Sequence, residues 1–337
     1  MFVRLLACVL ALYEGTLSAQ VSMEVDLPAN DIAFNAQTGL LYASIASSAG
    51  LPYGNHLIEI SSNTASIVRS VFVGSEPGPI GMSPDAAVAY VGLNGAARVI
   101  PVDLTSLTTG TDFTMGNSQY EGPRYAGEIA VMPGAANSVA IVLSNACCTP
   151  SSEGVGIFDN GVERPGANTD FSGPTTIAFG SSPSTLYGYD GEDTSYNFSR
   201  MTIDASGISN IDNAGGIFEG FFLRIVSVGD IVFSSSGAVV DGTQLELLGT
   251  YTTPSYGTPG AIVVDKISSI VILAKNNTLY MFDRDTFIPV NYVTITNATG
   301  NPIAAATCGT ACVAVVYDSS QIFVVPDVVD IFANGFE

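Results

Sequence analysis

The sequence of 337 residues contains no tryptophan, a single histidine and two lysines. Without tryptophan, every repeat type whose motif is built on that residue is excluded. With one histidine, few side chains titrate near neutral pH, so general acid–base catalysis has little support. The sequence also lacks the Gly-x-Ser-x-Gly and His-Glu-x-x-His motifs of serine hydrolases and zinc proteases. These absences favour a protein that is not an enzyme and leave an unusual catalytic site open.

Long apolar runs are also missing, and no segment reaches the length of about 20 residues that a membrane-spanning helix needs. The N-terminus combines a basic residue at Arg4, an apolar run over Leu5–Tyr13 and small residues up to Ala19. This pattern predicts a secretory signal peptide over residues 1–19. Leu5 to Cys8 resembles a lipoprotein box, but the apolar run continues past the cysteine. We therefore expect export without a lipid anchor.

Basic residues are few, so the formal net charge is −21. Removal of residues 1–19 takes away one arginine and one glutamate, which leaves 9 basic and 30 acidic residues and the same net charge. Such a field repels phosphate backbones and anionic membranes, so nucleic acid is not an expected partner. Cationic partners and divalent cations are favoured. The simpler interpretation is that acidity keeps an exported protein soluble.

The sequence is rich in short apolar segments of Val, Ile, Thr, Tyr and Phe, bounded by Gly, Pro, Asn and Ser, which is typical of β-strands. These segments repeat, and seven units of about four strands predict an all-β, seven-bladed β-propeller over residues 20–326. The seventh unit lacks a fourth strand, and we predict that Met23–Leu27 supplies it and closes the ring. An isoleucine opens the inner strand of each unit, at intervals of 48, 49, 48, 48, 37 and 41 residues: Ile32, Ile80, Ile129, Ile177, Ile225, Ile262 and Ile303.

One unit, within Leu57–Asn94, preserves the repeat best. It contains Val73-Gly74-x-x-Pro77, then Ile80-x-x-Ser83-Pro84-Asp85, then Ala89-Tyr90-Val91. These segments resemble the repeat of YVTN-type seven-bladed propellers, and Thr278–Asp283 is a later copy, while units three and five depart from the pattern. The resemblance implies a fold, because such propellers serve as surface-layer components, binding proteins and occasionally enzymes. Propellers with Trp-Asp or quinoprotein motifs are excluded by the absence of tryptophan.

Excluding Cys8, four cysteines remain in a chain that we expect to be exported. Cys308 ends an inner strand and Cys312 begins the next, so the turn brings them together and we predict a disulfide. Cys147 and Cys148 are adjacent at the opposite end of a second strand, and are either a vicinal disulfide or two thiols. A zinc site is the alternative, but the only histidine lies in another unit and the ligand spacing is wrong.

Ligands of propellers usually bind at the face that carries the loops from second to third strands and from each fourth strand to the next unit. The long loops of this face belong to units one to four, and long loops are where function concentrates. Their aromatic and charged side chains suit a carbohydrate, peptide or protein ligand. The alternative is that these are ordinary solvated loops with locally packed aromatics. The candidate ligand-binding residues are Tyr53, His56, Tyr120, Arg124, Tyr125 and Tyr196.

No cofactor is predicted, with one weak exception. Asp190, Glu192 and Asp193 are a candidate calcium site, because carboxylates are ligands that calcium prefers. They lack the alternating spacing of a dedicated calcium loop, so a solvated acidic turn is the simpler interpretation. A metal there would support an alternative function, a hydrolase or lactonase-like propeller.

The location that we expect is the medium or the bacterial cell envelope, either the periplasm or the outer surface. A purely structural envelope component is the second alternative to a binding module at the cell surface. Residues 327–337 form a tail whose end, Ile-Phe-x-x-Gly-Phe-Glu, resembles a C-terminal segment of exported proteins from some Gram-negative bacteria. A sorting signal and a tail whose Phe332 and Phe336 pack on the ring both remain open. The sequence does not indicate the oligomeric state.

Overall fold

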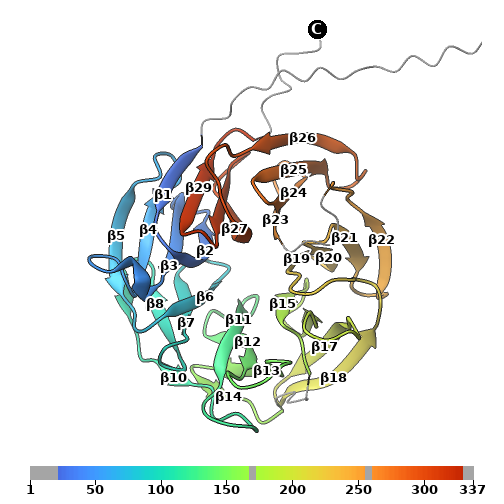
Figure 1. Ribbon diagram of the computed structural model, residues 1–337. Helices are drawn as coiled ribbons and strands as arrows, with labels where there is room; N and C mark the ends of the chain where they lie inside the picture. Colours follow the sequence, from blue (N-terminus) through green and yellow to red (C-terminus); the bar gives the residue numbers. More distant parts are fainter. Residues whose placement is uncertain (1–21, 167–171, 255–259, 329–337) are drawn as a thin grey trace, which may run out of the picture.

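The computed structural model describes residues 22–166, 172–254 and 260–328. The predicted signal peptide and the end of the predicted tail, residues 329–337, lie outside these residues. Seven antiparallel sheets form a closed ring (Figure 1), which confirms the seven-bladed β-propeller. Blades 1 to 7 begin in turn with the inner strands β2 (Ala29–Asn35), β6 (Pro77–Met82), β11 (Tyr125–Val131), β15 (Thr176–Phe179), β19 (Ile225–Val228), β23 (Ala261–Asp265) and β27 (Pro302–Thr307).

Each inner strand pairs with a second strand, and the second with a third, as the repeat predicts. The second strands are β3 (Leu40–Ile45), β7 (Val88–Leu93), β12 (Ser138–Ser144), β16 (Thr185–Tyr189), β20 (Ile231–Ser234), β24 (Ile270–Lys275) and β28 (Val313–Tyr317). The third strands are β4 (His56–Ser61), β8 (Arg98–Asp103), β13 (Ser152–Asp159), β17 (Phe198–Asp204), β21 (Ala238–Asp241), β25 (Thr278–Asp283) and β29 (Gln321–Val325).

The outer strands form the rim of the ring and are the most variable in length. They are β5 (Ile67–Phe72), β9 (Thr108–Thr109) with β10 (Phe113–Thr114), β14 (Val162–Glu163), β18 (Gly207–Ala214), β22 (Glu246–Thr250), β26 (Pro289–Thr294) and β1 (Met23–Asp26). Among the described residues, helical structure is confined to a short 3-10 turn, η1 (Ser47–Ala49). No helix there is long and apolar enough to cross a membrane.

The ring closes through strands from the two ends of the propeller. β1 is the outer strand of blade 7 and pairs antiparallel with β29, with Val25 opposite Ile322. Val25 is buried with Ile322 and Val324 in one apolar cluster. This pairing confirms the predicted closure and covers an edge of β29 that would otherwise be open to other chains. Past β29, Val328 is also buried, and its N–H donates to the carbonyl of Ala311 (2.7 Å).

The core lies between neighbouring blades. The second and third strands are buried on both faces, which explains their continuous apolar runs, such as Val313–Tyr317. Each apolar cluster joins two blades, as where Leu57 of blade 1 packs with Val91 and Ile100 of blade 2. Full burial of an aliphatic side chain stabilises a fold by about 1.5–3 kcal/mol, so these interfaces hold the ring together.

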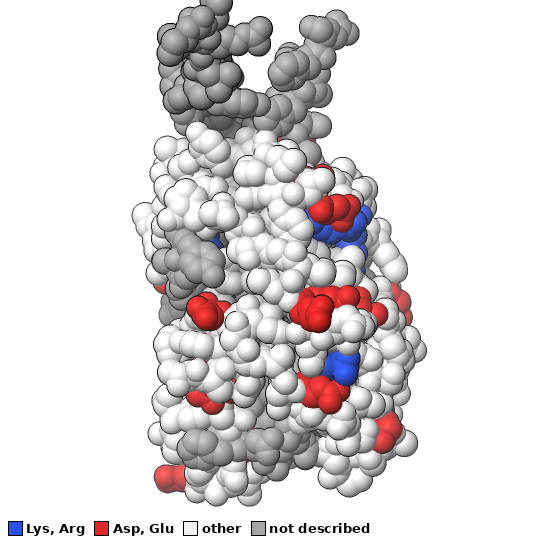
Figure 2. All heavy atoms as spheres, turned by 90° about the vertical axis from the view of Figure 1, so that its right-hand side faces the viewer, with Lys and Arg blue, Asp and Glu red and all other residues white. Residues whose placement is uncertain are grey.

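Charge is distributed in a simple way. All seven arginines of the described residues pair with a carboxylate. In six of these pairs the two partners belong to the same blade. The exception is Arg224 of blade 5, whose partner Glu128 belongs to blade 3. On the rim around β22, Figure 2 shows acidic side chains in small separate groups on a largely uncharged surface. On this side of the ring the negative charge is therefore spread out and forms no single large patch.

Candidate functional site

A cavity of about 720 Å³ opens at the mouth of the central channel. It lies at the starts of the inner strands β2, β6 and β11, and beside Arg224 just before β19. Asn94 and Asn145 follow the second strands β7 and β12, so this is the face on which we expected a ligand. Its walls are mainly polar: Asn30, Asp31, Glu76, Asn94, Asn145 and Arg224.

Three charged residues, Asp31, Glu128 and Arg224, occupy equivalent positions in blades 1, 3 and 5. Each comes directly before the isoleucine that marks the repeat. Neighbouring residues of a strand point in opposite directions, so the buried isoleucines Ile129 and Ile225 pack between blades while the preceding residues reach the channel. We call these three residues the channel triad. In β11 the strand register shifts between Ala126 and Ile129, and such a bulge changes the direction in which a side chain points.

Asp31 also fixes the geometry of the ring. One carboxylate oxygen of Asp31 accepts a hydrogen bond from its neighbour, Ile32 N–H (2.8 Å), and the other from Ile80 N–H in the next blade (2.8 Å). Thr176, at the equivalent position of blade 4, accepts one from Ile225 N–H (3.3 Å). The same position therefore links successive inner strands in two places around the channel.

Arg224 is held rigidly by its backbone. Its N–H donates to the hydroxyl of Ser235 (3.0 Å), and its carbonyl accepts a hydrogen bond from Ser235 N–H (2.8 Å). The guanidinium lies 3.6 Å from the carboxylate of Glu128, the longest of the seven ion pairs. The side chains of Arg224 and Glu128 are 41% and 24% exposed. The pair is therefore loose and accessible, and Arg224 keeps donors that can face a ligand.

Loss of hydration in the channel controls the protonation of the two carboxyl groups of the triad. Although part of the Glu128 side chain is exposed to the channel, the protein around it desolvates the carboxyl group and raises its pKa to about 7, an effect that the nearby charge of Asp31 increases and that Arg224 opposes. Burial also raises the pKa of Asp31, against the lowering effects of Arg224 and of two backbone N–H groups. Near neutral pH, Glu128 is therefore present both as an acid and as a carboxylate. The triad offers a cationic donor beside a group that can donate or accept a hydrogen bond.

Of the six predicted ligand-binding residues, only Tyr125 lines this cavity. Arg124 instead pairs with the buried carboxylate of Glu153 (3.1 Å) and is itself largely buried. His56 Nδ1 lies 2.8 Å from the carbonyl of Gly54, and its ring packs edge-on against Phe72 (5.6 Å).

The remaining three candidates lie elsewhere on the loops. Tyr53 packs against the apolar cluster between blades 7 and 1. Tyr120 is exposed, and its backbone N–H donates to the hydroxyl of Ser118 (3.0 Å). Tyr196 lies against Phe221 in a second group of aromatics. The structure therefore does not bring the predicted residues together in one site.

Two of the three candidate calcium ligands lie together and the third points away. The hydroxyl of Ser172 lies within hydrogen-bond distance of carboxylate oxygens of both Asp190 and Asp193. Glu192 points to the neighbouring blade, where its carboxylate accepts hydrogen bonds from the N–H and hydroxyl of Ser151. Within the described parts of the chain, no group of three or more His, Cys, Asp or Glu side chains is placed to hold a metal ion.

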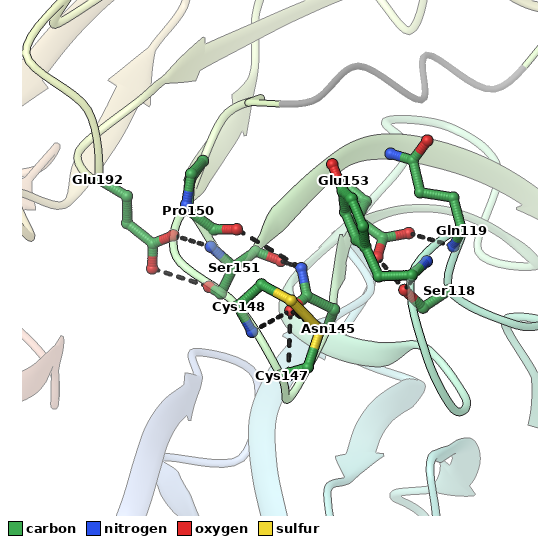
Figure 3. Close-up of a disulfide and its surroundings, with 10 residues drawn as sticks. Ser118, Gln119, Asn145, Cys147, Cys148, Pro150, Ser151, Glu153 and Glu192 are labelled. Carbon is green, nitrogen blue, oxygen red and sulfur yellow. Dashed lines mark hydrogen bonds between the residues drawn. A yellow bond between two sulfur atoms is a disulfide. The ribbon is translucent and has the colours of Figure 1, made fainter.

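A vicinal disulfide lies beside the cavity. Cys147 and Cys148 are joined in the loop between β12 and β13 (Figure 3). The side-chain oxygen of Asn145 accepts hydrogen bonds from the N–H groups of Cys147 (3.1 Å) and Cys148 (2.9 Å), while its amide group donates to Ser151 (2.9 Å). Glu192 of blade 4 binds Ser151 near the end of this loop. Hydrogen bonds of Asn145 and Ser151 therefore hold the loop near both its start and its end.

The second disulfide joins Cys308 to Cys312 in the turn between β27 and β28. Cys308 N–H also donates to the carbonyl of Cys312 (3.0 Å), so the turn is closed by a backbone bond as well. This turn follows the end of an inner strand, whereas the cavity lies where inner strands begin. The two disulfides therefore lie on opposite faces of the ring.

Comparison with known proteins supports the fold. No protein-family model and no curated protein matches this chain. Among solved structures, the chain is similar to hydrazine synthase of Kuenenia stuttgartiensis, with a TM-score of 0.66 and 14% sequence identity. The alignment covers 91% of this chain and 98% of that chain. At this identity the likeness is one of fold alone, and it identifies the chain as a β-propeller.

Proposed function

We propose that this chain is an exported binding protein and that a short polypeptide segment of its ligand occupies the channel-mouth cavity. The observation that carries the proposal is the channel triad: Asp31 and Arg224 line the cavity, and Glu128 forms a loose and accessible pair with Arg224. The volume of about 720 Å³ falls within the range of small-ligand sites, roughly 300–1,000 Å³.

Charge distinguishes a peptide from a carbohydrate as the ligand. Placing ionised groups such as Asp31 and Arg224 in a channel costs free energy, because they lose part of their hydration. A ligand with charges of its own compensates for that cost through charge-assisted hydrogen bonds. A neutral oligosaccharide cannot do so, whereas the ends and side chains of a peptide can. Tyr125 and the asparagines Asn94 and Asn145 supply the contact area and the neutral hydrogen bonds.

Export is the second part of the proposal. It is supported by the predicted signal peptide over residues 1–19, by the two cysteine pairs and by the net charge of −21. The resemblance of Leu57–Asn94 to the repeat of YVTN-type propellers agrees with a binding role at the cell surface. We place the mature protein in the periplasm, on the outer surface or in the medium.

A binding screen with a matched pair of variants tests this function. Calorimetric titration would compare capped and uncapped tetrapeptides of varied charge with neutral and acidic oligosaccharides. We expect charged peptides to bind, and Arg224→Gln to weaken them at least tenfold. Arg200→Gln is the control, because Arg200 pairs with Asp212 on the rim. Binding of oligosaccharides alone, or equal affinities for the two variants, would contradict the proposal.

A further inference from the structure

Two exposed phenylalanines and a partly buried tyrosine form a group on the same face, over blades 4 and 5. Phe221 and Phe222 lie in the loop that enters blade 5, and Tyr196 in the loop between β16 and β17. The ring centroids are 5.3 Å apart for Tyr196 and Phe221, and 6.3 Å apart for Phe221 and Phe222. Phe221 is 42% exposed and Phe222 is 65% exposed. We call these three residues the aromatic ledge.

Hydrogen bonds and buried aromatic side chains hold the loop of the ledge in place. Phe222 N–H donates to the carbonyl of Gly191 in blade 4 (3.0 Å). The hydroxyl of the buried Tyr189 donates to the carbonyl of Gly220 (2.6 Å). Phe218, earlier in the same loop, is buried edge-on against Tyr189 (5.4 Å). Exposed rings in a fixed position lose little further entropy on binding, and grouped exposed apolar side chains are typical of interaction sites.

The surroundings of the ledge are negative. Burial raises the pKa of Tyr189, and the carboxylates of Asp190, Asp193 and Glu219 raise it further, which places these three groups around the base of the ledge. Glu219 is exposed and lies two residues before Phe221. The nearest arginine in sequence, Arg224, is paired with Glu128 at the channel. Aromatic faces beside carboxylates attract organic cations, because the ring quadrupole and the carboxylate charge act together.

We propose that the aromatic ledge binds arginine and lysine side chains of a basic polypeptide, next to the cavity. This inference rests on the proposed function, since it names the class of peptide that the same face recognises. Phe222 is two residues from Arg224, a separation of at most about 7 Å along the chain, so one extended peptide can reach both. A polypeptide is favoured over a small cation because Phe221 and Phe222 are exposed at the surface and a chain bound to them can also extend to the cavity. The net charge of −21 attracts the same partner at long range.

The test uses a capped, fluorescein-labelled peptide of twelve residues in which Gly and Arg alternate. Fluorescence anisotropy would compare it with Gly–Glu and Gly–Ser peptides of the same length. Phe222→Ala should weaken the Gly–Arg peptide by about five- to tenfold. Phe72→Ala is the matched control, since Phe72 is 60% exposed but lies on the outer strand of blade 1. Circular dichroism would show that both variants are folded.

A second pair of variants separates the ledge from the overall negative charge. Glu219→Gln and Glu246→Gln each remove one exposed carboxylate, and only Glu219 lies at the ledge. We expect a two- to threefold loss of affinity for Glu219→Gln and no change for Glu246→Gln. Equal effects within both pairs of variants would overturn the ledge as a binding site.

The arginine variant makes the two proposals distinguishable. If Arg224→Gln weakens binding of the charged tetrapeptides while Phe222→Ala leaves binding of the Gly–Arg peptide unchanged, the cavity is a site and the ledge proposal fails. If Phe222→Ala weakens binding of the Gly–Arg peptide while Arg224→Gln leaves binding of the tetrapeptides unchanged, the ledge proposal stands and the cavity proposal fails. If an oligosaccharide binds and the Gly–Arg peptide does not, the ledge proposal is wrong as well.

Discussion

The guanidinium of Arg224 lies 3.6 Å from the carboxylate of Glu128 although the two residues belong to blades 5 and 3. The two side chains therefore meet in the channel, past the inner strand of the intervening blade 4. Every other arginine of the described residues pairs within its own blade. An ion pair that joins non-adjacent blades adds little to the packing of either blade. We regard it as part of a binding site, and its properties lead to the first prediction.

Glu128 should make stability fall as pH rises. Its pKa is raised to about 7 in the folded protein, so the folded state binds more protons than the unfolded state between about pH 4.5 and 7. Stability is therefore highest below this window and is lost as the pH passes through it. In Glu128→Gln this loss should disappear, so between pH 5 and 8 the variant should gain about 1–3 kcal/mol relative to the wild type. Urea unfolding of the wild type and of Glu128→Gln at pH 5 and pH 8 measures this difference in the free energy of unfolding.

Asp31 and Arg224 are present in both proteins, so the comparison isolates the titration of Glu128 together with its coupling to these two charges. The same difference between variant and wild type at pH 5 and at pH 8 would show that Glu128 has an ordinary pKa.

The buried carboxylate of Glu59 should be important for the stability of blade 1. It accepts hydrogen bonds from the hydroxyl of Tyr42 (2.9 Å) and from two nitrogens of Arg69 (2.6 Å each). Glu59→Ala should cost about 2–4 kcal/mol, because it leaves the Tyr42 hydroxyl buried without its acceptor and Arg69 without its partner. Tyr42→Phe, which removes one hydrogen bond, should cost about 1 kcal/mol. Equal unfolding free energies for Glu59→Ala and the wild type would contradict this.

Closure of the ring by β1 predicts both a loss of stability and self-association when the closure is broken. Val25→Asp places a charge in the buried interface with β29 and should cost about 2–4 kcal/mol. It should also free the edge of β29 for pairing with other chains. Asp26→Asn, on the same strand but exposed, is the control. Thermal unfolding and size-exclusion chromatography would detect both effects, and identical profiles for the two variants would argue against closure by β1.

Both cysteine pairs should be oxidised in protein purified without reductant. Intact mass spectrometry after alkylation should show no modified thiol among Cys147, Cys148, Cys308 and Cys312, and four after reduction. Replacing Cys308 and Cys312 by serine should cost only about 2 kcal/mol, because the loop is very short. Four alkylated cysteines without reductant would show that neither disulfide forms.

The sequence predicts the fold well because strand patterns are local. The isoleucine repeat locates all seven inner strands, and Met23–Leu27 overlaps β1. Blade 7 departs from the pattern of burial: the register shifts between Pro302 and Ala304, and Ala304 is buried in place of Ile303, whereas the repeat isoleucines of the other six blades are buried. A shift of this kind depends on how the blade packs against its neighbours, which a single sequence does not show.

The site is harder to predict because its members are far apart in the sequence. Glu128 and Arg224 meet only after the ring has closed, and nothing in the loop around Arg124 reveals that Glu153 will pair with it. A signal was nevertheless present, since the residue before the repeat isoleucine is charged in blades 1, 3 and 5. Loop length points to blades 1 to 4 and does not indicate Phe221 and Phe222, which lie in the loop that enters blade 5.

The most direct measurement fills the cavity without changing its charges. Ala146 is exposed and lines the cavity, so Ala146→Trp should block it. Ala96→Trp, at an exposed position between β7 and β8 on the same face, adds the same side chain outside the cavity lining. In calorimetric titrations with the best charged tetrapeptide, we predict that Ala146→Trp loses binding while Ala96→Trp keeps the wild-type affinity. Unchanged binding by Ala146→Trp would contradict the account.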